Sequence, residues 1–267
     1  MKAKGLFLWA ILMVLGSGAA LAQMGLSVSP PRVYYTVDNG QTDVQEVLVT
    51  NVSETHTMEL AFSLGDWEYD RYGENKMFPA DTLKNSCAAW VTIEGDQYLS
   101  LKPKESKVVH VSITVPFDLE NDEPARTAML YVTQMNPVDD VNTQGANIKV
   151  SVQSGIKLFV RGSEPRLPQI DITNMKFDKE SQILILEFNN EGNVWINGEV
   201  STYLLNQSTG EELTVTGNYF YTMPGDERVM RIALPEEMTK AKYTATVMLD
   251  YGDSEHMEAA ELEFNYE

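Results

Sequence analysis

After residue 23 the chain consists mainly of short segments in which apolar and polar residues alternate, and this period of two restricts its fold most. Successive side chains of a β-strand point to opposite faces, so strict alternation predicts half-buried strands. Clear examples are VVHVSITV at 108–115 and AMLYVTQ at 128–134. No apolar period of 3.6 persists over three turns, so no long amphipathic helix is expected.

The spacing of the strand-like segments predicts β-sandwiches. About 245 residues follow position 22, and a sandwich takes roughly 100 residues, so two sandwiches are expected. Two prolines and a glycine interrupt the pattern at 161–168. We therefore expect an all-β chain with one domain at 23–163 and a second at 164–267.

Residues 1–22 have the features of a secretory signal peptide. Lys2 and Lys4 precede an apolar run at 6–15, and the small-residue pattern Ala-Leu-Ala ends at residue 22. The apolar run is too short to span a bilayer as an ordinary helix. We expect cleavage after residue 22 and no membrane insertion afterwards; the alternative is an uncleaved N-terminal anchor.

The charge of the chain argues against two classes of partner. There are 20 Lys and Arg residues against 39 Asp and Glu residues, for a net charge of −19. Such a chain repels nucleic acid phosphates and anionic membrane surfaces. The single cysteine, Cys87, cannot form an internal disulfide, and we expect it to be a small buried apolar residue.

Catalytic and metal chemistry find little support. His56, His110 and His256 are isolated, and no zinc-protease, nucleophile-elbow, P-loop or dinucleotide motif occurs. The segment DWEYDRYG at 66–73 lacks the spacing of a calcium loop, so a hairpin tip carrying aromatic residues is favoured. We predict a protein that is not an enzyme and that needs no cofactor or metal.

The most informative segment is a long alternating run that ends near the domain boundary. Ile148, Val150 and Val152 share one face, and we expect one strand from 148 to 160 with this row continuing inward. Lys157 and Arg161 should project from the opposite face.

A second cation, Arg32, follows Pro30 and Pro31 near the start of the first domain. Prolines here are compatible with an edge strand or with a strand that changes sheets.

Three stretches resemble the PapD-like family of periplasmic pilus-assembly chaperones: SVSPPRVYY at 27–35, IKVSVQSGIKLFVRG at 148–162 and MLDYG at 248–252. The resemblance implies two immunoglobulin-like sandwiches at an angle, in the shape of a boomerang. It also implies export to the periplasm. The implied partners are secreted subunits with incomplete β-sandwiches and an outer-membrane usher.

The resemblance also implies roles for particular residues. Arg32 and Lys157 would lie in the interdomain cleft and anchor the C-terminal carboxylate of a client. Ile148, Val150 and Val152 would fill the client's incomplete sandwich, while the backbone of the strand pairs with the client's open edge. Arg161 and Asp250 would form an ion pair that sets the angle between the domains.

The chain departs from the family pattern in ways that indicate a divergent branch. Gln134 stands where we align an acid of the family's hinge, and DWEYDRYG and the segment 76–89 lengthen the first domain. The alternating row and the two cations also fit an ordinary sandwich face with solvated charges.

Two other functions remain open. One is a structural or adhesive component of a cell-surface assembly. The other is a hydrolase or carbohydrate-binding sandwich in which Trp67, Tyr69 and Tyr72 form a stacking platform.

Overall fold

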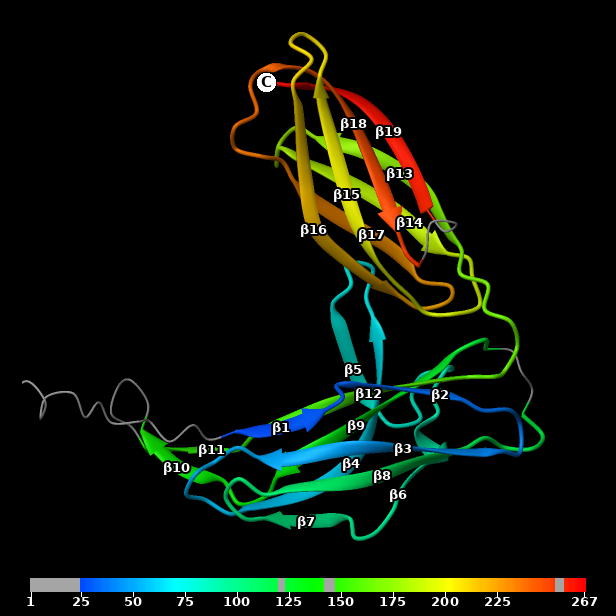
Figure 1. The fold of residues 1–267 in the computed structure, drawn as a ribbon, viewed down its shortest axis with the longest axis vertical. Coiled ribbons are helices and arrows are strands. Elements are labelled where there is room, and N and C mark those ends of the chain that lie inside the picture. Colours follow the sequence, from blue (N-terminus) through cyan, green and yellow to red (C-terminus); the bar gives the residue numbers. More distant parts are fainter. Residues whose placement is uncertain (1–24, 120–122, 142–146, 253–256) are drawn as a thin grey trace, which may run out of the picture.

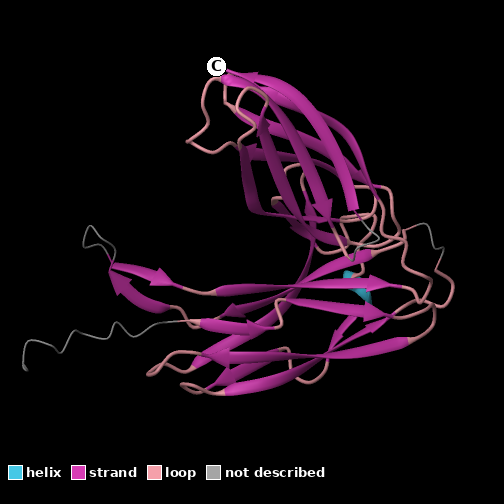
Figure 2. Cartoon of the chain, turned by 45° about the horizontal axis from the view of Figure 1, so that its top comes forward, coloured by secondary structure: helices cyan, strands magenta, loops and turns pink. Residues whose placement is uncertain are grey.

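The computed structural model describes residues 25–119, 123–141, 147–252 and 257–267. The predicted signal peptide and His256 lie outside these ranges. Apart from one 3₁₀ turn, η1 (Ala88–Trp90), the regular structure of the described residues is entirely β (Figures 1 and 2). Two sandwiches meet at an angle, as expected (Figure 1). No helix among the described residues is long and apolar enough to cross a membrane.

The first domain packs two sheets face to face. One sheet has the order β1-β3-β8-β6, and the opposing sheet has the order β2-β12-β9-β4-β5, with β7 also paired to β4. The strands of the first sheet are β1 (Leu26–Ser29), β3 (Thr42–Asn51), β6 (Val91–Ile93) and β8 (Ser106–Thr114). Those of the second are β2 (Arg32–Thr36), β4 (Met58–Tyr69), β5 (Asn75–Pro79), β7 (Tyr98–Leu101), β9 (Arg126–Gln134) and β12 (Gln153–Arg161).

The second domain is a smaller sandwich. One sheet has the order β13-β14-β17 and the other has the order β16-β15-β18-β19. Its strands are β13 (Ile170–Asp178), β14 (Ile183–Asn190), β15 (Ile196–Asn206), β16 (Glu212–Thr222), β17 (Glu227–Ala233), β18 (Ala241–Asp250) and β19 (Met257–Tyr266).

The alternation seen in the sequence produces a separate core in each domain. In β14 every second side chain is buried, and Leu184, Leu186 and Phe188 are fully enclosed. In the first domain, Leu130 and Leu158 belong to the equivalent core. Each fully buried side chain of this kind stabilises the fold by about 1.5–3 kcal/mol. Cys87 is buried in the first core, as expected.

The prolines near the N-terminus separate two strands that belong to different sheets. β1 pairs with β3, whereas β2 pairs with β12 in the opposing sheet. Pro30 and Pro31 lie between them, and both arrangements that the prolines allow are present, since β1 and β2 are edge strands of different sheets. This change places Arg32 at the first position of β2.

The expectation of one continuous strand from 148 to 160 is wrong. The segment forms β11 (Asn147–Val150) and β12, separated at Ser151 and Val152. There, the Ser151 hydroxyl donates a hydrogen bond to the Gln134 carbonyl (2.6 Å), and the Gln134 N–H donates to the Val152 carbonyl (2.8 Å). β11 instead pairs with β10 (Val138–Val141). The two strands form an arm that projects from the sandwich (Figure 2).

Candidate functional site

The structure brings Arg32 and Lys157 side by side. β2 runs parallel to β12, and Lys157 is the register partner of Arg32. The Lys157 N–H donates to the Pro31 carbonyl (3.1 Å), which holds the start of β2 against β12. Two residues 125 positions apart in the chain are therefore neighbours at the point where the two strands first meet.

The ammonium of Lys157 lies in an aromatic and largely buried environment. Its Nζ is 3.9 Å from the ring centroid of Trp67 and 4.1 Å from that of Tyr69. It donates a hydrogen bond to Oδ1 of Asn75 (2.5 Å). Burial, together with the nearby charge of Arg32, lowers the pKa of Lys157 to about 7.

Arg32 links the first domain to the second. Its guanidinium carbon is 4.1 Å from the ring centroid of Tyr221, which belongs to β16. Among the described residues, neither Arg32 nor Lys157 forms an ion pair with an acidic side chain. Two adjacent cations at the domain junction therefore lack a described counter-charge, which is the arrangement that an incoming carboxylate would complete.

The two cations face a groove on the outer side of the β2-containing sheet. Its volume is about 600 Å³. It is lined by Pro31, Arg32, Asn75, Met77, Met129, Tyr131, Gln153, Gly155 and Lys157. We call it the terminal groove.

The predicted strand-addition row lies outside the core. Ile148 is 38% exposed, and Val150 and Val152 are half-buried. One edge of this segment is covered, since β11 pairs with β10 and β12 pairs with β9. No described strand pairs with the other edge before Lys157, where β2 begins. The row therefore differs from the inner face of an ordinary sandwich.

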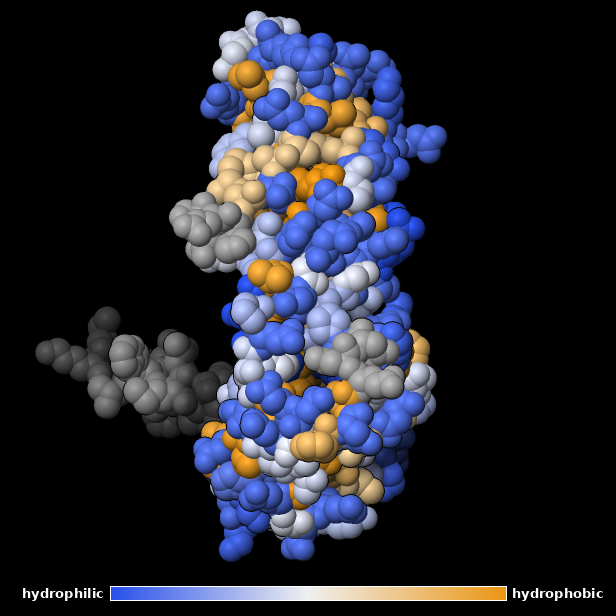
Figure 3. Space-filling view, turned by 90° about the vertical axis from the view of Figure 1, so that its right-hand side faces the viewer, coloured by the Kyte–Doolittle hydropathy of each residue, from blue (hydrophilic) through white to orange (hydrophobic). Residues whose placement is uncertain are grey.

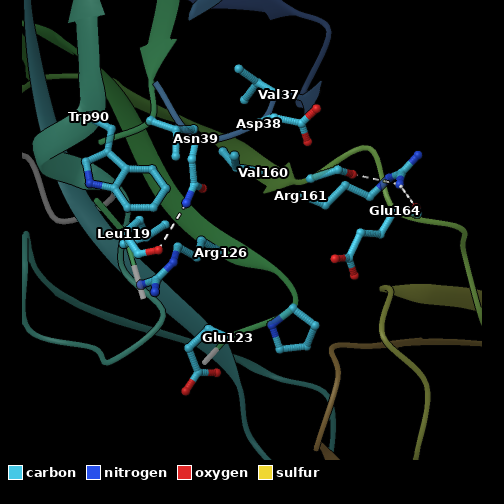
Figure 4. A pocket seen from close by; sticks show the side chains of 13 residues that line it. Val37, Asp38, Asn39, Trp90, Leu119, Glu123, Arg126, Val160, Arg161 and Glu164 are labelled. Carbon is cyan, nitrogen blue, oxygen red and sulfur yellow. Dashed lines mark hydrogen bonds between the residues drawn. The ribbon is translucent and has the colours of Figure 1, made fainter. Parts of the chain in front are cut away.

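Arg161 and Asp250 both lie among the described residues, and they do not form an ion pair. Arg161 instead donates to the carbonyl oxygens of Gly162 (3.0 Å) and Glu164 (3.1 Å), beside a cavity of about 280 Å³ next to the linker (Figure 4). Asp250 is exposed at the end of β18. The linker is held instead by Asp38, whose carboxylate accepts hydrogen bonds from the N–H and the hydroxyl of Ser163.

Gln134 does not lie at the hinge where our alignment placed it. It is buried at the end of β9 next to the arm. The opposite end of β9, at Arg126, pairs with Val160 near the linker. The hinge lies at the Arg126 end of β9, and Gln134 lies at the other end of this nine-residue strand, so the two positions are a full strand length apart.

The segment DWEYDRYG forms the predicted hairpin, but its tip docks on the second domain. β4 and β5 are its strands, and β5 rises toward the upper domain (Figure 1). Arg228 donates to the Asp70 carbonyl (2.8 Å), and the Val229 N–H donates to the Arg71 carbonyl (2.7 Å). Because Val229 lies in the edge strand β17, the tip covers part of that edge.

The proposed aromatic stacking platform is wrong. Trp67 is fully buried and donates its indole N–H to the Ala128 carbonyl (2.9 Å), and Tyr69 is 9% exposed. Tyr72 alone of the three is well exposed. Trp67 and Tyr69 instead join an interdomain cluster with Phe159 and Met223. Their spacing of two, which puts both on one strand face, was the available signal.

Two residues of the site gave no signal in the sequence. Asn75, which accepts the hydrogen bond from Lys157, is an ordinary turn residue by sequence. Tyr221 stands out only as one aromatic residue in an alternating strand. Their roles depend on contacts between segments that are far apart in the chain.

His56 and His110 are not part of this site. His110 lies in β8 on the first sheet, where Nε2 is 3.4 Å from a Glu46 carboxylate oxygen. His56 is exposed and its ring contacts the Thr55 hydroxyl. Among the described residues, no group of three or more His, Cys, Asp or Glu side chains is placed to hold a metal ion.

No protein-family model and no curated protein matches this sequence. Solved structures do match. The YadV chaperone superimposes with a TM-score of 0.50 at 15% identity, covering 91% of this chain and all of YadV. The SafB chaperone of Salmonella enterica, solved in complex with the SafA pilin, gives 0.48 at 13% identity over 91% of this chain and 99% of SafB. The E. coli chaperone DraB gives 0.47 at 19% identity over 91% of this chain and 96% of DraB.

This chain has the fold of the YadV chaperone. The predicted resemblance is thereby confirmed for the fold, with two immunoglobulin-like domains. Each of these three matched structures is a chaperone. The face in Figure 3 carries mainly hydrophilic side chains on both domains, as the strong acidic charge leads one to expect.

Proposed function

We propose that this chain is a periplasmic chaperone that binds secreted subunits with incomplete β-sandwiches by β-strand addition. The observation that carries the proposal is the pairing of Arg32 with Lys157 where an open strand edge ends. The fold shared with YadV supports the same class of function. Delivery of clients to an outer-membrane usher completes the proposal.

The open edge provides the backbone hydrogen bonds through which a client strand would bind. An incomplete sandwich exposes unpaired N–H and C=O groups that invite aggregation, and an added strand satisfies them. The segment 147–156 has such groups along its outer edge, with Ile148, Val150 and Val152 partly exposed beside it. These side chains would enter the client's apolar groove while the two backbones pair.

The two cations fix the register in which a client strand pairs with the open edge. A C-terminal carboxylate accepts charge-assisted hydrogen bonds from Arg32 and Lys157, which fixes where the client strand ends. Lys157 is nearly buried, so removing its ammonium leaves a desolvated carboxylate without one partner. Such a loss costs on the order of 2–5 kcal/mol, and 2 kcal/mol corresponds to about a 30-fold weaker complex.

The test compares partner recovery from the secreting cell. Affinity-tagged wild type, Lys157→Ala and Lys157→Met are purified, and co-secreted proteins are quantified. The methionine keeps the apolar stem over Trp67 and Tyr69, so it separates loss of charge from loss of packing. Lys242→Ala is the matched control, since Lys242 is exposed in β18 and paired with Glu263.

We expect both Lys157 variants to lose at least about 30-fold in recovered partner while Lys242→Ala retains it. Equal recovery from all four proteins would remove the carboxylate anchor. A partner that stays with the protein permanently in a surface assembly would favour the structural or adhesive alternative instead.

A further inference from the structure

The tip of the β4–β5 hairpin is fastened to one strand of the second domain, β17. Arg228 of β17 donates a hydrogen bond to the Asp70 carbonyl (2.8 Å), and β17 also donates a backbone N–H to the Arg71 carbonyl (2.7 Å). The third contact places the guanidinium carbon of Arg231 5.4 Å from the centroid of the Tyr72 ring, within the range of cation–π attraction. Three consecutive tip residues therefore contact the second domain.

Arg228 is the buried member of this set of contacts. Only 4% of its surface is exposed, and its guanidinium packs so closely on Gly73 that a Cβ there would clash with it. Its Nε has no hydrogen-bond partner in the part of the chain that the structure describes. Burying a charged group is costly unless it is hydrogen-bonded, so the bond to the Asp70 carbonyl favours the docked position of the tip.

The base of the same hairpin surrounds the Lys157 ammonium. Trp67 and Tyr69 on β4 form cation–π contacts with it, and Asn75 on β5 accepts its hydrogen bond. Arg32 on β2 is the charged group that acts on this ammonium. The enclosure of Lys157 therefore depends on where the hairpin lies, and Figure 1 shows β5 rising from the first domain toward the second.

The tip and the base of the hairpin are directly joined. Tyr69 pairs with Asn75 on the opposite strand, and the next residue, Asp70, carries the carbonyl that Arg228 holds. The guanidinium carbon of Arg228 also lies 5.9 Å from the centroid of the Tyr69 ring, which the Lys157 ammonium contacts as well. Because hydrogen-bonded elements and packed side chains carry energetic coupling between sites, displacing the tip must disturb the enclosure of Lys157.

We propose that Arg228, a residue of the second domain, positions the Lys157 anchor of the first. Arg228 fastens the hairpin tip to β17, and the docked hairpin keeps its two rings and the Asn75 amide around the ammonium. The inference rests on the proposed function for its consequence, which is a preorganised partner for the client carboxylate. The enclosure itself is measurable in the free protein.

The test follows Lys157 by NMR, with lysine labelled with carbon-13 at Cε so that its chemical shift reports protonation. Lys157→Met assigns the resonance. Two variants weaken the tip: Arg228→Met removes the buried donor, and Arg231→Met removes only the exposed contact with Tyr72, so that it leaves every buried side chain in place. Ile232→Val is the matched control, since Ile232 is fully buried on the same strand and packs in the core of the second domain.

We expect the pKa of Lys157 to be about 7 in wild type. In Arg228→Met it should be higher by at least about 1 pH unit, because a released hairpin admits water to the ammonium. Arg231→Met should raise it by a smaller amount. Ile232→Val should titrate like wild type.

Binding of a synthetic peptide of about 12 alternating apolar and polar residues reports the consequence for the anchor. It is measured at pH 6, where the Lys157 ammonium is mainly protonated, with a free C-terminal carboxylate and as an amide. Arg228→Met should weaken binding of the acid by at least about threefold and leave binding of the amide unchanged. Ile232→Val should bind both peptides as wild type does.

An unchanged Lys157 pKa in both tip variants, with wild type still preferring the acid to the amide, overturns the positioning role and leaves the proposed function standing. A raised pKa in the tip variants, with acid and amide bound equally by wild type, supports the positioning role and overturns the anchor. A pKa raised equally by Ile232→Val would mean that Arg228 acts only through the stability of the second domain, and this also overturns the proposal.

Discussion

The two halves of the segment 147–161 share one alternating pattern and differ in what surrounds them. In the inner half, every residue from Ile156 to Val160 is buried. In the outer half, Ile148 is 38% exposed and its neighbours are exposed or half-buried. The inner half is covered on both faces, by the first-domain core and by the interdomain cluster. Alternation thus marks a strand, while burial is decided by what packs against it.

This difference explains how one ribbon can serve two purposes. The inner half is paired on both edges, by β9 and β2, and holds Lys157 in place. One edge of the outer half pairs with no described strand and lies beside a row of apolar side chains. A rigid anchor is therefore continuous with an open edge.

The largest effect should come from truncating the same residue type in the two halves. Ile156 is fully buried, so Ile156→Ala should lower the free energy of unfolding by about 2–5 kcal/mol. Ile148→Ala should change it by no more than about 0.5 kcal/mol, because Ile148 is partly exposed. Urea unfolding of both variants measures this, and equal losses would contradict the comparison. Partner recovery should fall for Ile148→Ala despite its unchanged stability.

A smaller effect should follow from weakening the contact between the β4–β5 hairpin and the second domain. Trp67 and Tyr69 of this hairpin belong to the interdomain cluster that covers the inner half. Gly73 at the hairpin tip has φ of +85°, and a Cβ there would clash with the guanidinium group of Arg228. Gly73→Ala should therefore cost more than about 1 kcal/mol and weaken docking of the hairpin on the second domain. Limited proteolysis at the tip measures the docking.

Gly210→Ala is the matched control for this prediction. Gly210 also has positive φ, at +73°, but nothing lies near its missing Cβ. It should therefore share the backbone cost without changing cleavage at the hairpin tip. Equal cleavage of the Gly73 variant and wild type would show that Arg228 does not hold the tip.

The remaining expected effect is a pH dependence located at the boundary between the halves. The pKa of Lys157 is about 7 in the free protein, and a bound carboxylate raises it. Above pH 7 binding therefore takes up a proton, and affinity should fall by up to about tenfold per pH unit. The affinity for a synthetic peptide of about 12 alternating apolar and polar residues with a free C-terminal carboxylate, measured between pH 6 and about 9, tests this. The same peptide with an amidated C-terminus should show a flatter pH profile.

Raising the pH has the opposite effect on folding stability from its effect on binding affinity. Arg32 is the charged group that acts on Lys157, and Tyr69, whose pKa is raised to about 12 by burial, stays neutral in this range. The unfolded chain holds the Lys157 proton more tightly, with a pKa of about 10.4. Stability from this group should therefore rise between pH 7 and about 10, and Lys157→Met should remove that rise.

Local signals predicted much of the fold, and long-range contacts account for what they missed. The alternating runs at 108–115 and 128–134 became β8 and β9, and the prolines before Arg32 became a change of sheet. The break at Ser151 depends on a hydrogen bond to Gln134, 17 residues away. Docking of the hairpin depends on Arg228 and Asp70, which are 158 positions apart. No local pattern encodes such contacts.

The candidate site was predictable only in part, and for a similar reason. The proximity of Arg32 and Lys157 was implied by the family resemblance rather than by alternation. Asn75 and Tyr221 completed the site from a hairpin and from the other domain. Their contribution comes from packing between the domains, which the sequence of neither segment specifies.

The most direct test of the central claim is amide hydrogen exchange along 147–161, with and without the synthetic peptide that ends in a free carboxylate. In the free protein, every second amide of 147–156 should exchange rapidly, because it points to the open edge. Saturating peptide should slow these amides by at least about tenfold, while the amides of 157–161 stay protected throughout. Slow exchange at 147–156 in the free protein, or exchange unchanged by bound peptide, would contradict an edge that is open for strand addition.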